Sequence, residues 1–234
     1  MKMKEFKIML TLLMSIIGMK VMAYDIAVEN ADGVTIYYNY SEDGTELIVT
    51  LGGQNGYSGD VVIPDEVTYM NRTRKVTSIG DWAFRDCSFL TSVTIPNSVT
   101  YIGALAFYYC LRLTSMTIGN SVTSIGEDAF MYCGSLRSIN VTVTDYAAFC
   151  NNKVVGLVGL LNKDFLLIDD KGNEIKNFVV PNSVTSIGDK AFYGCKGLTS
   201  VTIGNSVTSI GSSAFGNCSG LTSVTIPNSV TSIG

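Results

Sequence analysis

Residues 90–110, LTSVTIPNSVTYIGALAFYYC, are one copy of a unit that recurs along most of the chain. The unit contains a V-T-x-I-G block, and the Ile-Gly pair that ends this block occurs six times, at Ile79-Gly80, Ile102-Gly103, Ile125-Gly126, Ile187-Gly188, Ile210-Gly211 and Ile233-Gly234. Neighbouring copies are 23 residues apart, except that an insertion lengthens the step from 125 to 187. A fixed period in the twenties predicts a solenoid built from stacked units.

The spacing of apolar residues changes within the unit. Val93-Thr-Ile95 alternates with a period of two, which is typical of a short strand. Pro96-Asn97, replaced by Gly-Asn in other copies, then predicts a turn. Val99 to Ile102 is interpreted as a second extended segment. Ala106-Phe107-x-x-Cys110 has helical spacing, and its length allows one or two turns of helix.

A single unit is too small to be stable by itself. Each fully buried apolar side chain contributes roughly 1.5–3 kcal/mol, whereas ordering the backbone costs about 1–2 kcal/mol per residue. Neighbouring units supply the missing cover and hydrogen bonds. The L-x-x-L-x-L spacing from Leu90 is that of leucine-rich repeats. We therefore predict an α/β leucine-rich repeat solenoid with a 23-residue period. Its parallel sheet would line the concave face, with short helical turns and extended segments on the convex side.

The repeated blocks also resemble a known family. Asn97 to Gly103, Asn120 to Gly126 and the five Ala-Phe-x-x-Cys blocks are similar to the BspA-like leucine-rich repeat proteins of anaerobic bacteria. The resemblance covers about residues 24–234. It implies a cell-surface or secreted adhesion protein, and it does not specify the ligand because the family is large.

Residues 1–23 have the features of a secretory signal peptide. Lys2, Lys4 and Lys7 precede an apolar run from Ile8 to Ile17, and small residues end the segment at Ala23. The alternative is a short membrane anchor, but the uninterrupted apolar run is too short to span a bilayer. Removing this segment changes the formal net charge from −4 to −7. The predicted location is therefore outside the cell or on its surface.

The segment 24–75 does not repeat and is predicted to be a β-rich N-terminal cap with the first rung. Strands are expected near residues 34–38 and 46–51, joined by a turn at Ser41 to Gly44. Asp60 to Pro64 matches the repeated strand and is predicted to be the first rung. Such caps shield the terminal repeats of solenoids from water.

Repeats occupy 76–141 and 177–234, and an island at 142–176 separates them. Within it, Asp145 to Cys150 predicts a short helix with Asp145 at its N-cap. Residues 165–180 predict a hairpin around Asp170 to Asn173, whose second arm enters the next repeat. The sequence stops within a unit and shows no polar cap, so we expect either a fragment of a longer protein or an open last rung.

The composition argues against an enzyme. The chain has no histidine, which removes the commonest general base and metal ligand. We expect no catalytic residue, no cofactor and no metal site. Five of the six cysteines hold the same repeat position, where parallel side chains do not converge as a disulfide requires. We therefore predict buried thiols, the alternatives being disulfides or bound zinc.

Two surfaces are candidates for binding. The outward residues of the predicted strands form a ladder of short polar side chains: Ser92, Thr94, Ser115, Thr117, Ser138, Asn140, Ser200, Thr202, Ser223 and Thr225. The predicted helical turns carry aromatic residues: Trp82, Tyr108, Tyr109, Tyr132 and Tyr193. Aromatic side chains are enriched where proteins meet partners. The alternatives are that Ser and Thr merely suit exposed strands, and that the rings only fill gaps between turns.

The leading hypothesis is a non-enzymatic secreted or surface protein that mediates adhesion by binding a host or neighbouring-cell protein or glycan. The alternative is a structural spacer that presents another domain, and a less favoured one is a glycan-processing enzyme. Nucleic acid is not an expected partner, because its binding requires an excess of Lys and Arg. No second long apolar segment follows residue 23, so we expect no transmembrane span in the mature chain.

Overall fold

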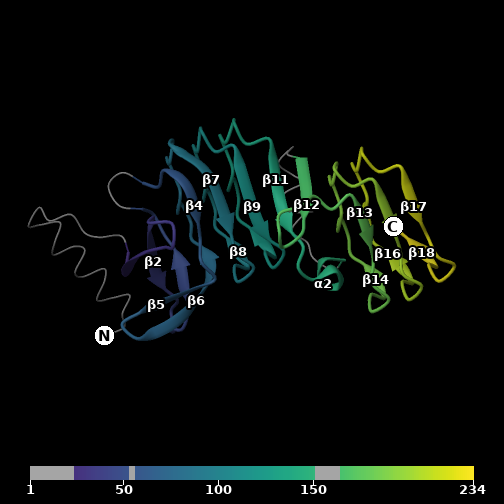
Figure 1. Ribbon diagram of the computed structural model, residues 1–234, viewed down its shortest axis with the longest axis horizontal. Helices are drawn as coiled ribbons and strands as arrows, with labels where there is room; N and C mark the ends of the chain where they lie inside the picture. The colour runs from purple at the N-terminus through teal and green to yellow at the C-terminus, as the bar shows by residue number, and fades with distance from the viewer. Residues whose placement is uncertain (1–23, 53–55, 151–163) are drawn as a thin grey trace, which may run out of the picture.

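The computed structural model describes residues 24–52, 56–150 and 164–234. The predicted signal peptide at 1–23 lies outside these residues. Figure 1 shows the described chain winding through successive coils that lie side by side along the long axis of the molecule. The chain is therefore a β-solenoid whose coils correspond to the sequence repeats.

A first row of parallel strands takes one strand from each coil. In the first half of the molecule it forms a five-stranded sheet of β4 (Gly59–Val62), β7 (Leu90–Ile95), β9 (Ser115–Gly119), β11 (Ser138–Thr142) and β12 (Asp164–Ile168). Val93 pairs with Met116, 23 residues further along the chain. This pairing confirms the predicted register.

The first row does not continue as one sheet. In the second half, β13 (Asn177–Val179), β15 (Ser200–Thr202) and β17 (Ser223–Thr225) form a separate three-stranded sheet. Ile175 N donates to Leu167 O of β12 at 2.7 Å. The edge of β12 therefore pairs with the returning arm of a hairpin instead of with β13. The prediction of a single parallel sheet containing both Val93 and Val201 is wrong for this reason.

A second row of strands runs alongside the first, and in the regular coils each of its strands follows a Pro-Asn or Gly-Asn turn. It contains β3 (Leu47–Val49), β6 (Arg72–Ile79), β8 (Tyr101–Ile102) and β10 (Ser124–Ile125) in the first half, and β14 (Ser186–Ile187), β16 (Ser209–Ile210) and β18 (Ser232–Ile233) in the second. Most of these strands are two residues long. The glycine that follows is required by packing, because a Cβ on Gly103 would lie 2.5 Å from the backbone nitrogen of Asp81.

The Ala-Phe-x-x-Cys segments are not helical, contrary to the prediction. Residues 81–86 form consecutive turns, and their backbone nitrogens donate to the next coil. Phe84 N, for example, donates to Ala106 O at 2.7 Å. Left-handed residues bend each segment twice, as at Trp82 (φ 62°) and Asp86 (φ 57°). These turns make a third ladder between coils, so the fold is a β-solenoid with little helix and not the predicted α/β arrangement.

The N-terminal cap is a β-meander. β1 (Ile26–Glu29) pairs antiparallel with β2 (Thr35–Tyr40), and β2 pairs antiparallel with β3. β3 then pairs in parallel with β6, which attaches the meander to the second row of strands. A hairpin of β5 (Glu66–Tyr69) and β6 extends from the same region. The meander thus covers the first coil.

The core between the strand rows and the turns is a stack of equivalent side chains. Phe84, Phe107 and Phe130 stack nearly parallel at centroid distances of 4.8 and 5.3 Å. The six cysteines form no disulfide with one another, and five of them are buried as predicted, whereas Cys218 is half-buried. The thiol of Cys110 donates to Phe84 O at 3.1 Å, and the same bond recurs in later coils. Each of these thiols therefore links its own coil to the preceding one.

The island connects the two halves of the solenoid, and a short helix stands there in place of a strand of the second row. α2 (Tyr146–Cys150) is capped by Asp145 Oδ1, which accepts from Ala147 N and Ala148 N at 2.9 Å. Cys150 O accepts from Gly188 N at 2.8 Å, the bond that an Ile carbonyl makes in ordinary coils. Figure 1 shows α2 beside β14, where the missing strand of the second row would lie.

Candidate binding surfaces

The predicted polar ladder lies on the outer face of the first row of strands, which we call the strand face. The sheet break divides it into two groups. One group comes from β7, β9 and β11 and contains Ser92, Thr94, Ser115, Thr117, Ser138 and Asn140. The other comes from β15 and β17 and contains Ser200, Thr202, Ser223 and Thr225. The structure therefore places these residues on two separate patches.

Some side-chain hydroxyls of the strand face already donate hydrogen bonds to other residues of the protein. Asp60 Oδ1 accepts from the hydroxyls of Thr91 and Ser92 at 2.7 Å, and these bonds lower the pKa of Asp60. Asn177 Oδ1 accepts from the Ser200 hydroxyl in the same way at 2.7 Å. The first strand of each sheet thus holds the neighbouring hydroxyls, which leaves fewer of them for a ligand.

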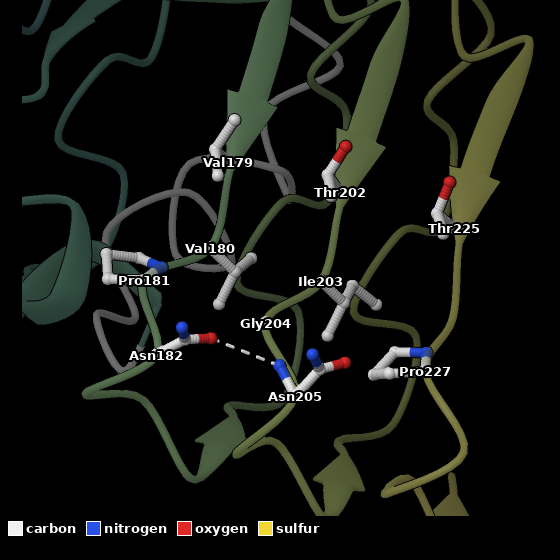
Figure 2. A pocket seen from close by; sticks show the side chains of 10 residues that line it. All are labelled: Val179, Val180, Pro181, Asn182, Thr202, Ile203, Gly204, Asn205, Thr225 and Pro227. Carbon is white, nitrogen blue, oxygen red and sulfur yellow. Dashed lines mark hydrogen bonds between the residues drawn. The ribbon is translucent and has the colours of Figure 1, made fainter.

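A shallow hollow of about 350 Å³ lies where the strand face meets the turns of the second half. Figure 2 shows the residues that line it: Val179, Val180, Pro181, Asn182, Thr202, Ile203, Gly204, Asn205, Thr225 and Pro227. Asn182 Oδ1 accepts from Asn205 N at 3.2 Å. Of these residues, only Thr202 and Thr225 are predicted from the sequence to bind a ligand.

The corresponding asparagine in the first half makes an additional hydrogen bond within the protein. Asn97 Oδ1 accepts from Asn120 N at 2.9 Å, as in the second half. Here, however, Asn97 Nδ2 also donates to Thr144 Oγ1 at 3.2 Å. The Pro-Asn and Gly-Asn pairs indicate both positions in the sequence, but the bond of Asn97 to a residue 47 positions away could not be predicted from them.

The second surface is formed by the turn segments of the first three coils. Four aromatic side chains lie together there, and we call them the aromatic band: Trp82, Tyr108, Tyr109 and Tyr132. Tyr108 and Tyr109 are 4.8 Å apart between ring centroids, Tyr109 and Tyr132 are 4.7 Å apart, and Trp82 and Tyr108 are 6.0 Å apart. Trp82, Tyr109 and Tyr132 are 38%, 39% and 50% exposed. The rings therefore form one exposed patch.

Three further apolar side chains on these turns are exposed and were not predicted from the sequence: Phe89, Leu111 and Met131. The guanidinium of Arg85 lies 4.6 Å from the Trp82 ring centroid, and that of Arg112 lies 5.0 Å from the Phe89 ring. Tyr193, which was predicted, lies in the second half, where Lys190 is 6.0 Å from its ring. It does not belong to the aromatic band.

The backbone positions of the aromatic band do not need aromatic side chains. Each turn has two left-handed residues, and Tyr109 (φ 61°) and Tyr132 (φ 62°) occupy the second of them. The equivalent residues in the second half are Gly194 (φ 76°) and Asn217 (φ 59°), and the same ladder forms there. Glycine and asparagine adopt this conformation more readily than tyrosine does. The chain therefore places rings where its own fold accepts less strained residues.

Charged residues border the aromatic band on both sides. Acidic residues stand at the beginning of the turn segments, before the rings: Asp81, Glu127 and Asp128. Basic residues stand at or just after the end of these segments: Arg112 and Arg137. All five side chains are exposed. Between the borders, Arg85 Nε and Asp86 Oδ2 form an exposed ion pair at 3.0 Å. Crowding by the neighbouring rings reduces the solvation of the Tyr108 hydroxyl and raises its pKa.

The described residues contain no group of three or more Cys, Asp or Glu side chains arranged to hold a metal ion. Over the same residues, no helix is long and apolar enough to cross a membrane.

The repeats match a known family of proteins. The family model for the BspA type leucine rich repeat region matches six copies, over residues 64–157 and 171–234. No curated protein matches the sequence.

Similar solved structures include a leucine-rich repeat protein of T. pallidum (24% identity, TM-score 0.44, covering 85% of this chain and 83% of that one). A leucine-rich cell surface protein of Faecalibacterium prausnitzii A2-165 is 20% identical, with a TM-score of 0.36 and coverage of 88% and 78%. A leucine-rich repeat protein of Bacteroides ovatus is also 20% identical, with a TM-score of 0.30 and coverage of 90% and 91%. Because the family model matches most of its length, the chain belongs to the family of BspA-type leucine-rich repeat proteins.

Proposed function

We propose that this chain is a non-enzymatic secreted or cell-surface protein that mediates adhesion by binding a protein through the aromatic band. The observation that carries the proposal is the exposure of aromatic side chains at positions where equivalent coils have Gly194 and Asn217. Trp, Tyr and Arg are the residues that dominate binding energy at protein interfaces. Family membership and the signal-like sequence at 1–23 support a location outside the cell.

Protein is favoured over glycan as the ligand by the arrangement of the rings. A sugar stacks best on an open aromatic face, but Arg85 covers one face of Trp82. The three tyrosines contact one another at interplanar angles of 47–75°. The band therefore presents ring edges and hydroxyl groups, and such amphipathic edges suit a protein surface. Glycan binding at the strand face is the second candidate because of the hollow in Figure 2.

The test compares the wild-type protein with a band variant that carries Trp82→Ser, Tyr109→Asn and Tyr132→Asn. These replacements are residues that the chain itself uses at equivalent positions, Ser213 and Asn217. The matched control is Tyr193→Met, outside the band. Binding to a panel of immobilised proteins, which includes matrix proteins and the purified chain itself, and to a glycan array is measured for all three. We expect wild type and control to bind a protein and the band variant to lose at least about tenfold in affinity. Equal binding by all three proteins, or no binding by wild type in either panel, would contradict the proposal.

A further inference from the structure

The aromatic band and its borders are complementary to themselves. The acidic border (Asp81, Glu127 and Asp128) stands at the beginning of the turn segments, and the basic border (Arg112 and Arg137) stands at or just after their end. Because the turn segments of stacked coils run in the same direction, the two borders fall on opposite sides of the rings. If a second copy is turned by 180° about an axis that lies in the patch and runs parallel to the stack of coils, each acidic border faces a basic border. Pairs related by a two-fold axis use the same patch on both partners, so this arrangement satisfies their main requirement.

The centre of the patch is equally suited to pairing with itself. The rings and the flanking Phe89, Leu111 and Met131 give an apolar centre that another copy would cover. Tyrosine hydroxyls both donate and accept hydrogen bonds, so a row of tyrosines can bond to an identical row. The charges at the centre, Arg85 and Asp86, already neutralise each other in an ion pair. Pairing would therefore bury these two charges together and not singly.

We propose that the partner of the aromatic band is a second copy of this chain, bound across a two-fold axis that places acidic border against basic border. The proposal rests on the binding function inferred above and identifies its partner. For a chain displayed on a surface, such pairing joins like molecules to one another, either on one cell or between cells. The patch is small, so the pair is weak in solution and strengthens where many copies are presented together.

Charge reversal of the borders tests the proposal. One variant carries Glu127→Lys and Asp128→Lys, and the other carries Arg112→Glu and Arg137→Glu. All four positions are exposed, so both variants should fold, which circular dichroism verifies. Self-association of each purified protein is measured by sedimentation velocity over a concentration series.

Wild type is expected to associate reversibly, and each border variant to associate roughly tenfold or more weakly, because like charges then face each other. An equimolar mixture of the two variants is expected to recover association, since both borders in the mixed pair join opposite charges. The band variant should remain monomeric, and Tyr193→Met should behave like wild type.

Three results would overturn self-recognition: a wild type that stays monomeric throughout, a band variant that associates like wild type, or a mixture no better than its components. A monomeric wild type that still binds an immobilised protein through the band would refute self-recognition alone. Loss of all band-dependent binding would refute the proposed function as well.

Discussion

At some positions, contacts with the preceding coil restrict which residue type a coil can contain. Gly119 stands where a Cβ would lie 2.5 Å from Asn97 Oδ1 and 2.7 Å from the Asn97 backbone. Asn97 uses that oxygen to accept from Asn120 N. The asparagine of a Pro-Asn pair therefore requires glycine in the next coil, and Asn182 requires Gly204 in the same way.

Gly119→Ala should lower the free energy of unfolding by about 1–3 kcal/mol, because the new methyl group displaces a hydrogen bond between coils. Gly134→Ala is the matched control, since a Cβ there has no atom within 4 Å. Urea denaturation at neutral pH measures both. Equal stability of the two variants would show that the coils can separate without cost.

The buried thiols make the protein sensitive to alkaline pH. Burial raises the pKa of Cys87 from 9.0 to about 11 and that of Cys150 to about 12. The folded state therefore holds these protons more tightly than the unfolded state. Stability should be constant up to about pH 9 and fall as the pH rises towards 11.

Urea midpoints at pH 7, 9 and 10 measure this dependence, and a double Cys87→Ala, Cys150→Ala variant is the control. The variant is less stable at neutral pH but should lose less stability on going from pH 9 to pH 10. Parallel losses in the two proteins would exclude Cys87 and Cys150 as the cause.

At the scale of elements, the sequence predicted the strands well and the turns poorly. Period-two alternation at Val93 to Ile95 has no helical counterpart, so the first row of strands could be located from it. Ala-Phe-x-x-Cys spacing, in contrast, fits both a helical turn and two consecutive left-handed bends. Only the hydrogen bonds to the next coil, such as Phe84 N to Ala106 O, decide between them.

The 23-residue coil should be removable as a unit. Deleting residues 91–113 joins Leu90 to Thr114, which restores the repeat because Leu90 and Leu113 are equivalent. We expect a folded protein with a cooperative but weaker urea transition, since the shorter stack has one interface fewer between coils. Deleting 91–110 instead leaves Leu111 to Leu113 as three extra residues in the coil at the junction, so that protein should be less stable than the 23-residue deletion. Urea denaturation distinguishes the outcomes, and equal stability of the two deletions would contradict the stacking account.

At the scale of the whole molecule, the coils form a scaffold whose faces vary while its backbone repeats. The sequence indicated which residues point outward but not which ones lie together. The sheet break, which divides the polar ladder, depends on a bond between Leu167 and Ile175 that no repeat pattern encodes. The aromatic band, in contrast, follows directly from the register, because Tyr109 and Tyr132 are 23 residues apart.

The central claim is that the aromatic band serves binding and is not needed for folding. The measurement that tests it most directly is the free energy of unfolding of the band variant, Trp82→Ser with Tyr109→Asn and Tyr132→Asn. Asparagine relieves left-handed strain of roughly 1–2 kcal/mol per residue, which offsets the packing energy that the exposed rings supply to one another. We predict a stability within about 1 kcal/mol of wild type. A loss of more than about 3 kcal/mol, typical of removing a buried ring, would show that the rings belong to the core and would contradict the claim.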